Sequence, residues 1–237
     1  MVDAVAAVAA AGVPIIVATG RSVWNCLHTV EDLGLTGIRL VCGNGAVGYD
    51  LATRQITHRD TFDPAPAAHA LAAALAGAGF AVDVDVTGFR TTREFPRDFP
   101  SVFLDPAAPL RELVSVPTTR LICRAESHPA DTVTAAAAAV LAGTGATWVC
   151  QRDHWLDITP EGATKATGVA RAAADLGIAP SDVLAIGDDT NDLEMFAWAG
   201  HAIAMGQAPA AVRAAADALT DTVHQDGVAV AVRRWFR

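Results

Sequence analysis

The sequence predicts an α/β protein in which a doubly wound parallel sheet forms the core and a smaller α+β domain is inserted between two parts of that core. At both ends of the chain, helical periodicity alternates with short apolar runs, which is typical of a parallel sheet covered by helices. Between these ends, short strand-like segments and proline-rich loops favour a mixed or antiparallel sheet. We therefore expect a first core part at residues 1–61, an inserted domain at 62–157 and a second core part at 158–237.

In the first core part, residues 2–11 are rich in alanine and predict a helix that ends at Gly12. The continuous apolar run VPIIVA (13–18) predicts a strand buried on both faces, because it lacks the alternation of a half-exposed strand. The polar stretch TGRS follows this strand. The next predicted elements are a helix at 23–33, a buried strand at 38–42 and a turn at Gly43-Asn44-Gly45.

The inserted domain differs in pattern from the core. We expect a helix at 69–78 and an alanine-rich helix at 133–141. The segments AVDVDV, RLICRA and TWVCQRD predict short strands, and proline-rich loops lie between Phe95 and Pro117.

The second core part returns to alternating helices and apolar strands. Its predicted elements are a helix at 166–176, a strand at 183–186, a helix at 192–199, a strand at 201–204, a helix at 208–216 and a final helix from Gly227.

Composition narrows the classes of function. Of the 237 residues, 52% are hydrophobic and 18% charged, which is ample for a buried core. The net charge is −9 and the 17 basic residues are scattered, so we expect no nucleic-acid partner. We also expect no membrane partner and a cytoplasmic location, because the chain has neither a basic leader nor a long uninterrupted apolar run. Oligomeric state leaves no trace in the sequence.

The cysteines do not form a metal motif. They are far apart and lack the Cys or Cys/His spacing of zinc sites, so we interpret them as buried small apolar residues. They are Cys26, Cys42, Cys123 and Cys150.

Two polar loops follow predicted core strands. Ligands of open α/β sheets bind at the carboxyl ends of the strands, so the loops after residues 18 and 186 should face one crevice. The Thr19 hydroxyl and the Gly20 backbone N–H suit a phosphate oxygen at a helix start. The alternative is that Thr19 or Ser22 simply caps the next helix.

The stretch LAIGDDTNDLEMF concentrates carboxylates after an apolar run. Asp188 and Asp189 are hard oxygen ligands suited to Mg²⁺, whereas Asn191 and Asp192 begin the next helix and serve equally well as caps. Several carboxylates in one turn repel each other unless a cation neutralises them. Lys165 is the candidate cation, although a lysine at a helix start is otherwise a solvated surface group.

Together, these stretches resemble the Cof-type sugar-phosphate phosphatases of the haloacid dehalogenase superfamily, which carry an inserted α/β cap. The matching stretches are IIVATGRS, VCGNGAVGYD, ITPEGATKATGV, AIGDDTNDLEMFAWAGHAIAMGQA and HQDGVAVAV. The resemblance implies a phosphatase that uses Mg²⁺ and acts on small phosphorylated molecules.

The resemblance also implies roles for individual residues. Thr19, Lys165 and Asp192 would be catalytic, Asp192 by orienting the lysine. Asp188 would bind Mg²⁺, with Asp189 as a weaker second contact. The residues that would bind phosphate or substrate are Thr19, Gly20, Arg21, Asn44, Lys165 and Asn191.

The family also requires an aspartate nucleophile and a second aspartate two residues later, in a DxDGT loop after the first core strand. Here the first predicted helix begins at residue 2, so that strand and both aspartates are missing. We expect the full protein to carry them upstream of Met1. The alternative is a short product with a rearranged sheet and no phosphatase activity, which would bind a phosphorylated ligand as a regulatory module.

Asp83-Val84-Asp85-Val86-Thr87 has the nucleophile spacing but lies within the inserted domain. We interpret it as part of a half-exposed strand. For other residues of this domain, two interpretations are open. The arginines are substrate contacts or solvated groups, and the His-Trp pair is a hinge contact or a surface histidine beside a core tryptophan. They are Arg90, Arg93, Arg97, His154 and Trp155.

Overall fold

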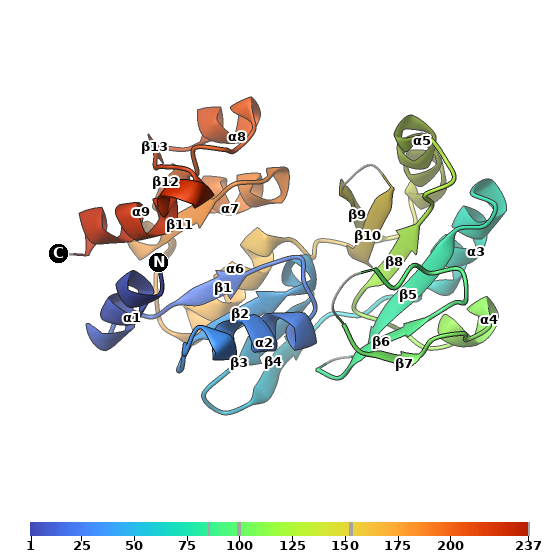
Figure 1. The fold of residues 1–237 in the computed structure, drawn as a ribbon, viewed down its shortest axis with the longest axis horizontal. Coiled ribbons are helices and arrows are strands. Elements are labelled where there is room, and N and C mark those ends of the chain that lie inside the picture. The colour runs from blue at the N-terminus through green and yellow to red at the C-terminus, as the bar shows by residue number, and fades with distance from the viewer. Residues whose placement is uncertain (85, 99–100, 152–153, 237) are drawn as a thin grey trace.

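The fold is seen in a computed structural model that describes residues 1–84, 86–98, 101–151 and 154–236 (Figure 1). The described strands form a four-stranded sheet near the N-terminus, a six-stranded sheet in the middle of the chain and a three-stranded sheet near the C-terminus. This arrangement confirms the predicted α/β class with a parallel core.

The first sheet begins as predicted. α1 (Val2–Ala10) precedes β1 (Ile16–Ala18), and α2 (Val23–Asp32) connects β1 to β2 (Arg39–Cys42). β1 and β2 are parallel, with Val17 paired to Leu40. A helix between two parallel neighbours is the crossover that a doubly wound sheet requires.

An unpredicted hairpin extends this sheet. β3 (Val47–Asp50) and β4 (Gln55–Arg59) run antiparallel beside β2, giving the order β1-β2-β3-β4. β3 is buried along its whole length, whereas exposed and half-buried residues alternate along β4, as expected of an edge strand with one face toward water.

The last sheet is parallel throughout. β11 (Leu184–Gly187), β12 (His201–Ala204) and β13 (Ala218–Leu219) pair in that order. The helices of this part are α6 (Lys165–Asp175), α7 (Leu193–Trp198), α8 (Ala210–Ala215) and α9 (Gly227–Trp235). Each corresponds to a predicted helix.

The two core sheets are not joined to each other. Among the described residues, β1 pairs with β2 alone and β11 with β12 alone, so each of these two strands lies at an edge of its sheet. The three residues of β1 are half-buried. The prediction of a strand at 13–18 buried on both faces is therefore wrong: the strand is shorter, and no described strand covers its second edge.

The middle of the chain forms a mixed sheet, as predicted, in the order β7-β6-β5-β8-β10-β9. Only its β6–β7 pairing is parallel among the described strands. The strands are β5 (Gly79–Val84), β6 (Gly88–Thr91), β7 (Phe103–Asp105), β8 (Leu121–Arg124), β9 (Ala146–Gln151) and β10 (Trp155–Pro160).

Within the part of the chain that the structure describes, three helices accompany this sheet: α3 (Ala65–Ala74), α4 (Leu110–Leu113) and α5 (Ala130–Leu141). α3 begins and ends four residues earlier than the predicted helix at 69–78, because Pro66 favours the first turn of a helix. The region between Phe95 and Pro117 holds β7 and α4 rather than loops alone.

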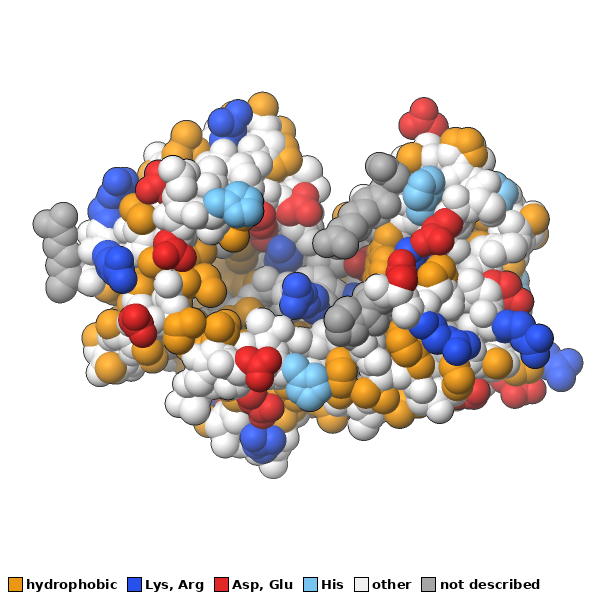
Figure 2. Space-filling view, in the orientation of Figure 1, with side chains coloured by type: hydrophobic (Ala, Val, Ile, Leu, Met, Phe, Trp, Pro, Cys, Tyr) orange, Lys and Arg blue, Asp and Glu red, His pale blue; other side chains and the backbone are white. Residues whose placement is uncertain are grey.

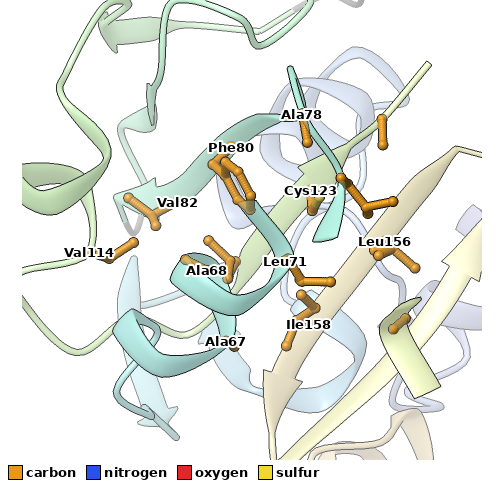
Figure 3. Close-up of a cluster of buried hydrophobic side chains, with 14 of the residues drawn as sticks. Ala67, Ala68, Leu71, Ala78, Phe80, Val82, Val114, Cys123, Leu156 and Ile158 are labelled. Carbon is orange, nitrogen blue, oxygen red and sulfur yellow. The ribbon is translucent and has the colours of Figure 1, made fainter. Parts of the chain in front are cut away.

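One face of the six-stranded sheet packs against the helices. Figure 3 shows Leu71 of α3 beside Leu156 and Ile158 of β10, and Phe80 of β5 belongs to the same cluster. All four residues are at most 1% exposed. Because side chains alternate along a strand, the residues between these apolar positions project from the opposite face.

The ends of the chain lie close together. α1 packs against α9, and the Met1 amino group lies 3.7 Å from a carboxylate oxygen of Asp226. None of the described helices combines the length and the apolar character needed to cross a bilayer. All four cysteines are free, and three of them are buried as expected, with Cys150 half-buried.

Candidate functional site

The loop after β1 is held by backbone hydrogen bonds to its neighbour. The Thr19 N–H donates to the Val41 carbonyl at 2.8 Å, and the Asn44 N–H donates to the Thr19 carbonyl at 3.1 Å. The Thr19 hydroxyl accepts the Arg21 N–H at 3.1 Å. Ser22, not Thr19, caps α2, since its hydroxyl accepts the Asn25 N–H at 3.3 Å.

The turn after β2 brings a buried amide to the same place. Asn44 is 5% exposed and has a left-handed backbone with φ of 52°. Gly45 lies against the start of α6, where a Cβ atom would stand 2.0 Å from the Thr164 carbonyl oxygen. Only glycine permits this approach, so the sequence Gly43-Asn44-Gly45 allows the turn and α6 to touch.

Lys165 is the first residue of α6, directly after the capping residue Thr164. Its Nζ donates to Asp192 Oδ1 at 2.7 Å, and the two residues are 8% and 3% exposed. The other oxygen of Asp192 accepts the N–H groups of Asp188 and Asp189 at 2.9 and 3.0 Å. Lys165 is therefore a buried, paired cation and not a solvated one.

Gly187 makes room for this ion pair. A Cβ atom there would lie 2.6 Å from Asp192 Cγ. Residue 187 ends β11, so the glycine lets the carboxylate fold back beneath the strand end. The sequence signal for this contact is the glycine that precedes the two aspartates.

Asn191 links the two core parts. Its Nδ2 donates to Asn44 Oδ1 at 3.1 Å across 147 positions of sequence. Its Oδ1 is buried and has no hydrogen-bond partner among the described residues. A buried acceptor without a partner is costly, so this oxygen is suited to a ligand that donates a proton or carries positive charge.

The two neighbouring aspartates differ in environment. Asp188 is exposed, and its Oδ2 accepts from Gln207 Nε2 at 3.1 Å. Asp189 Oδ1 accepts both the N–H and the hydroxyl of Thr190, at 2.6 and 3.3 Å, and so caps the short helix that follows. Within the described part of the chain, no three His, Cys, Asp or Glu residues form a group able to hold a metal ion.

A cavity of about 210 Å³ lies at this network. The two core parts supply Lys165, Asn44 and Asn191 to its wall, and the six-stranded sheet supplies a wall from β9 and β10. Figure 2 shows the molecule hollowed between the core and the six-stranded sheet, with basic and acidic side chains inside the hollow. The remaining lining residues are Thr147, Trp148, Val149, Thr159, Ala163, Thr164, Thr190 and Glu194.

Of the site residues expected from sequence, Asn44, Lys165 and Asn191 line the cavity. The others are not among its lining residues: Thr19, Gly20, Arg21, Asp188, Asp189 and Asp192. Hydrogen bonds nevertheless link several of them. Thr19 joins Asn44 through the backbone, Asn44 joins Asn191, and Asp192 joins Lys165 to the backbone of Asp188. Arg21 is exposed, and its guanidinium donates to the Thr29 hydroxyl at 3.3 Å.

Two of the three candidate arginines of the middle region contact partners within that region. Arg90 pairs with Asp105 at 3.1 Å, and Arg97 donates to the Pro106 carbonyl. Arg93 lines a separate cavity of about 300 Å³ formed entirely by residues of the six-stranded unit. Trp155 is a strand residue whose Nε1 donates to Asp157 at 2.9 Å, and His154 directly precedes that strand.

The DxDxT stretch is integrated into the six-stranded sheet. Asp83 lies on β5, and its side chain is 5% exposed because it pairs with Arg120 at 2.8 Å. As whole residues, Asp83 and Val84 are half-buried and the rest of β5 is buried, so the interpretation of a half-exposed strand holds only at this end of β5. Its partner in the motif, Asp85, lies outside the described residues.

Sequence reasoning missed two polar contacts of this region. Gln207 lies in the stretch HAIAMGQA, yet nothing in its spacing indicates that it would reach Asp188. Arg120 opens RLICRA, and its pairing with Asp83 depends on strand register, which the sequence does not reveal.

Comparison with known proteins places this geometry in a family. The family model described as haloacid dehalogenase-like hydrolase matches residues 1–84 and 115–232. A phosphoglycolate phosphatase of Natronomonas pharaonis is 30% identical over 225 residues, which cover 93% of this chain and 83% of that protein. A crystal structure of a haloacid dehalogenase-like hydrolase from Bacteroides thetaiotaomicron has a TM-score of 0.84 at 20% identity, covering 99% of this chain and 91% of that one.

Other relatives match over shorter stretches. The 5-amino-6-(5-phospho-D-ribitylamino)uracil phosphatase YcsE of Bacillus subtilis is 40% identical over 80 residues, which are 34% of this chain and 32% of that protein. Two further curated relatives are matched over 17% and 30% of their length. Because the family model covers more than half of the sequence and the Natronomonas relative aligns along nearly all of it, the chain belongs to the haloacid dehalogenase-like hydrolase family.

Proposed function

We propose that the chain works as a Mg²⁺-dependent phosphatase of small phosphorylated metabolites, with sugar phosphates as the substrate class. The observation that carries this proposal is the buried ion pair of Lys165 and Asp192, which holds an ammonium group beside the end of β11. Phosphoryl transfer depends mainly on positioning and on neutralising charge, and a fixed ammonium group supplies both. The names of the phosphatase relatives support the same reaction class.

In this proposal the chain's own residues bind and orient the phosphoryl group. The Lys165 ammonium neutralises it, and Asp192 holds the lysine in place. The Thr19 hydroxyl and the Gly20 N–H contact phosphoryl oxygens. The amides of Asn44 and Asn191 and the guanidinium of Arg21 complete the set.

The residues present fit a magnesium ion in part. Asp188 offers an exposed carboxylate at a strand end, and Mg²⁺ commonly takes one or two protein carboxylates together with water and phosphate. Asp189 is a weaker ligand because one of its oxygens already caps a helix. When bound, the ion would neutralise charge on the phosphoryl oxygens.

The nucleophile of this reaction is an aspartate expected upstream of Met1. Its carboxylate oxygen attacks phosphorus, the substrate alcohol leaves with a proton from the second aspartate, and water then hydrolyses the aspartyl-phosphate. The unpaired edges of β1 and β11 support this placement, because one strand between them would carry its loop to the Thr19 and Asp188 ends of both sheets.

We further propose that residues 62–157 act as a cap that closes the site. Support comes from the cavity, whose wall includes residues of β9 as well as Lys165. A volume of about 210 Å³ is below the range of sites for drug-sized ligands and suits a small metabolite.

The test is to extend the chain by about 25 upstream codons, enough for one strand and its loop, and to measure hydrolysis of p-nitrophenyl phosphate with Mg²⁺. Hydrolysis that requires Mg²⁺ and is abolished by Asp→Asn at the first upstream aspartate supports the proposal. An extended chain that binds a sugar phosphate without hydrolysing it would replace the enzyme with a regulatory binding module.

A further inference from the structure

Three adjacent strands of the six-stranded sheet bring charged residues together on one face. Asp83 lies on β5, Arg120 directly precedes β8 and Asp157 lies on β10. Their sequence neighbours Val82, Leu121 and Ile158 belong to the apolar cluster under the helices. Strand alternation therefore turns the charged residues to the other face.

Arg120 is buried and fully engaged. Its Nε and one terminal nitrogen contact the two oxygens of Asp83 at 2.8 and 3.3 Å, and its other terminal nitrogen lies 3.6 Å from Asp157. Its side chain is 4% exposed. Burial alone lowers the pKa of Arg120, but Asp83 and Asp157 more than offset this, so the pKa is raised and the guanidinium stays charged.

One nitrogen of this guanidinium also contacts a residue outside the six-stranded sheet. The nitrogen beside Asp157 also donates to the carbonyl of Gly20, 100 positions earlier in the chain. Gly20 lies in the loop after β1. The carbonyl of the next residue, Arg21, accepts the Gly43 N–H at 2.9 Å. A charged residue fixed in the inserted domain thus holds the backbone of the core loop.

We propose that Arg120 is a positioning residue that tethers the inserted domain to the Thr19–Arg21 loop, so that the cap and this loop move as one unit. Asp83 and Asp157 fix the guanidinium, and the Gly20 carbonyl accepts a hydrogen bond from one of its terminal nitrogens. This inference rests on the proposed function in one respect, namely that the Thr19–Arg21 loop binds the phosphoryl group.

Arg120→Lys tests the tether. An ammonium group keeps the charge but has a single nitrogen on a shorter side chain, whereas separate nitrogens of Arg120 contact Asp83 and the Gly20 carbonyl. We therefore expect the hydrogen bond to Gly20 to be lost. We expect backbone hydrogen exchange about tenfold faster at Arg21, Gly43 and Asn44, because a hydrogen bond to a charged group is lost. The measurement uses the 237-residue chain without substrate or Mg²⁺, so its result is independent of whether the chain hydrolyses phosphate.

Arg124→Lys is the matched control. Arg124 is the last residue of β8 and lies on the same face as Arg120, with a side chain 11% exposed, but pairs with Asp98 and Glu126 instead of the core. Its loop exchange should equal that of the unchanged chain. The tether is refuted if Arg120→Lys leaves loop exchange unchanged, or if exchange at Cys123 within β8 rises as much as in the loop.

If Arg120→Lys does not fold, a second variant tests the tether. Arg120→Met combined with Asp83→Leu and Asp157→Asn removes the three buried charges together, which avoids leaving a buried charge unpaired. The loop should again exchange about tenfold faster, while Cys123 stays protected. Slow loop exchange in this folded variant would also overturn the tether.

Discussion

Lysine is rarely buried, and Lys165 tolerates burial because Asp192 accepts its hydrogen bond at 2.7 Å. Asp192 keeps two backbone N–H donors when the lysine is removed. In the upstream-extended protein, Lys165→Ala should therefore lower kcat for p-nitrophenyl phosphate about 10²- to 10³-fold. Thermal unfolding should shift to a lower temperature, because the buried Asp192 carboxylate is left without its cation, so kcat is measured below that transition.

Asp188→Asn should lower kcat by a similar factor, since the amide removes a charge proposed to bind Mg²⁺. Arg171→Ala is the control for both variants. Arg171 lies on the same helix as Lys165, but its side chain is 48% exposed and pairs with Asp60. An unchanged kcat in either site variant would show that the residue has been given the wrong role.

Asp157 should make stability depend on pH. Burial raises the pKa of its carboxyl, although Arg120 and the Trp155 hydrogen bond act against the rise. Because the pKa of Asp157 is higher in the folded protein than the unfolded value of about 3.9, the protonated carboxyl stabilises the folded state. This stabilisation is fully present below the unfolded pKa. It is lost as the pH rises through the folded pKa.

Asp157→Asn should therefore flatten the free energy of unfolding across this window, while the amide oxygen still accepts the Trp155 N–H. Urea unfolding at a series of pH values from about 4 upward measures the change. Asp105→Asn, at a side chain 47% exposed, should leave the pH dependence as it is. An identical pH slope in the Asp157 variant would contradict the assignment.

At the scale of elements, the contact between the Gly43–Gly45 turn and α6 sets the distance from Asn44 to Lys165. Gly45→Ala would place a methyl group 2.0 Å from the Thr164 carbonyl, and the backbone there has φ of 105°. We expect a loss of stability about 2 kcal/mol greater than that of Gly177→Ala.

Gly177 isolates the backbone effect. It also has a positive φ, of 70°, but an added Cβ would meet no atom within 4 Å. Chemical denaturation of both variants separates the cost of the close approach from the cost of the left-handed backbone. Equal losses would mean that the turn moves away from α6 without penalty.

At the scale of the whole molecule, the open edges of β1 and β11 expose backbone groups that a sheet normally pairs. If the upstream segment supplies a strand between them, the extended protein should unfold at a higher temperature. The N–H groups of Ile16 and Ile186 face these open edges, because the alternate residues of β1 and β11 bond to β2 and β12. Their hydrogen exchange should slow, and exchange at Cys123 in the other sheet should stay constant. Unchanged exchange at both edges would place the extra segment elsewhere.

The alternation of helices and parallel strands in both core parts could be predicted from the amino-acid sequence, because periodicity and glycine signals are local. The sequence also located the polar loops at strand ends, where Thr19, Lys165 and Asp188 were expected from their chemistry. Predicted helix limits differ from those observed by up to four residues, at α3, where Pro66 starts the helix earlier.

The contacts among these groups, in contrast, could not be predicted from the sequence and depend on the three-dimensional fold. The hydrogen bond of Asn191 to Asn44, the burial of Lys165 and the contact of Arg120 with Gly20 join residues 27 to 147 positions apart. Strand register and the packing of separate elements set such contacts, and neither leaves a periodic signal in the chain. For the same reason β1 looked like a fully buried strand in sequence, although its burial depends on a neighbouring strand.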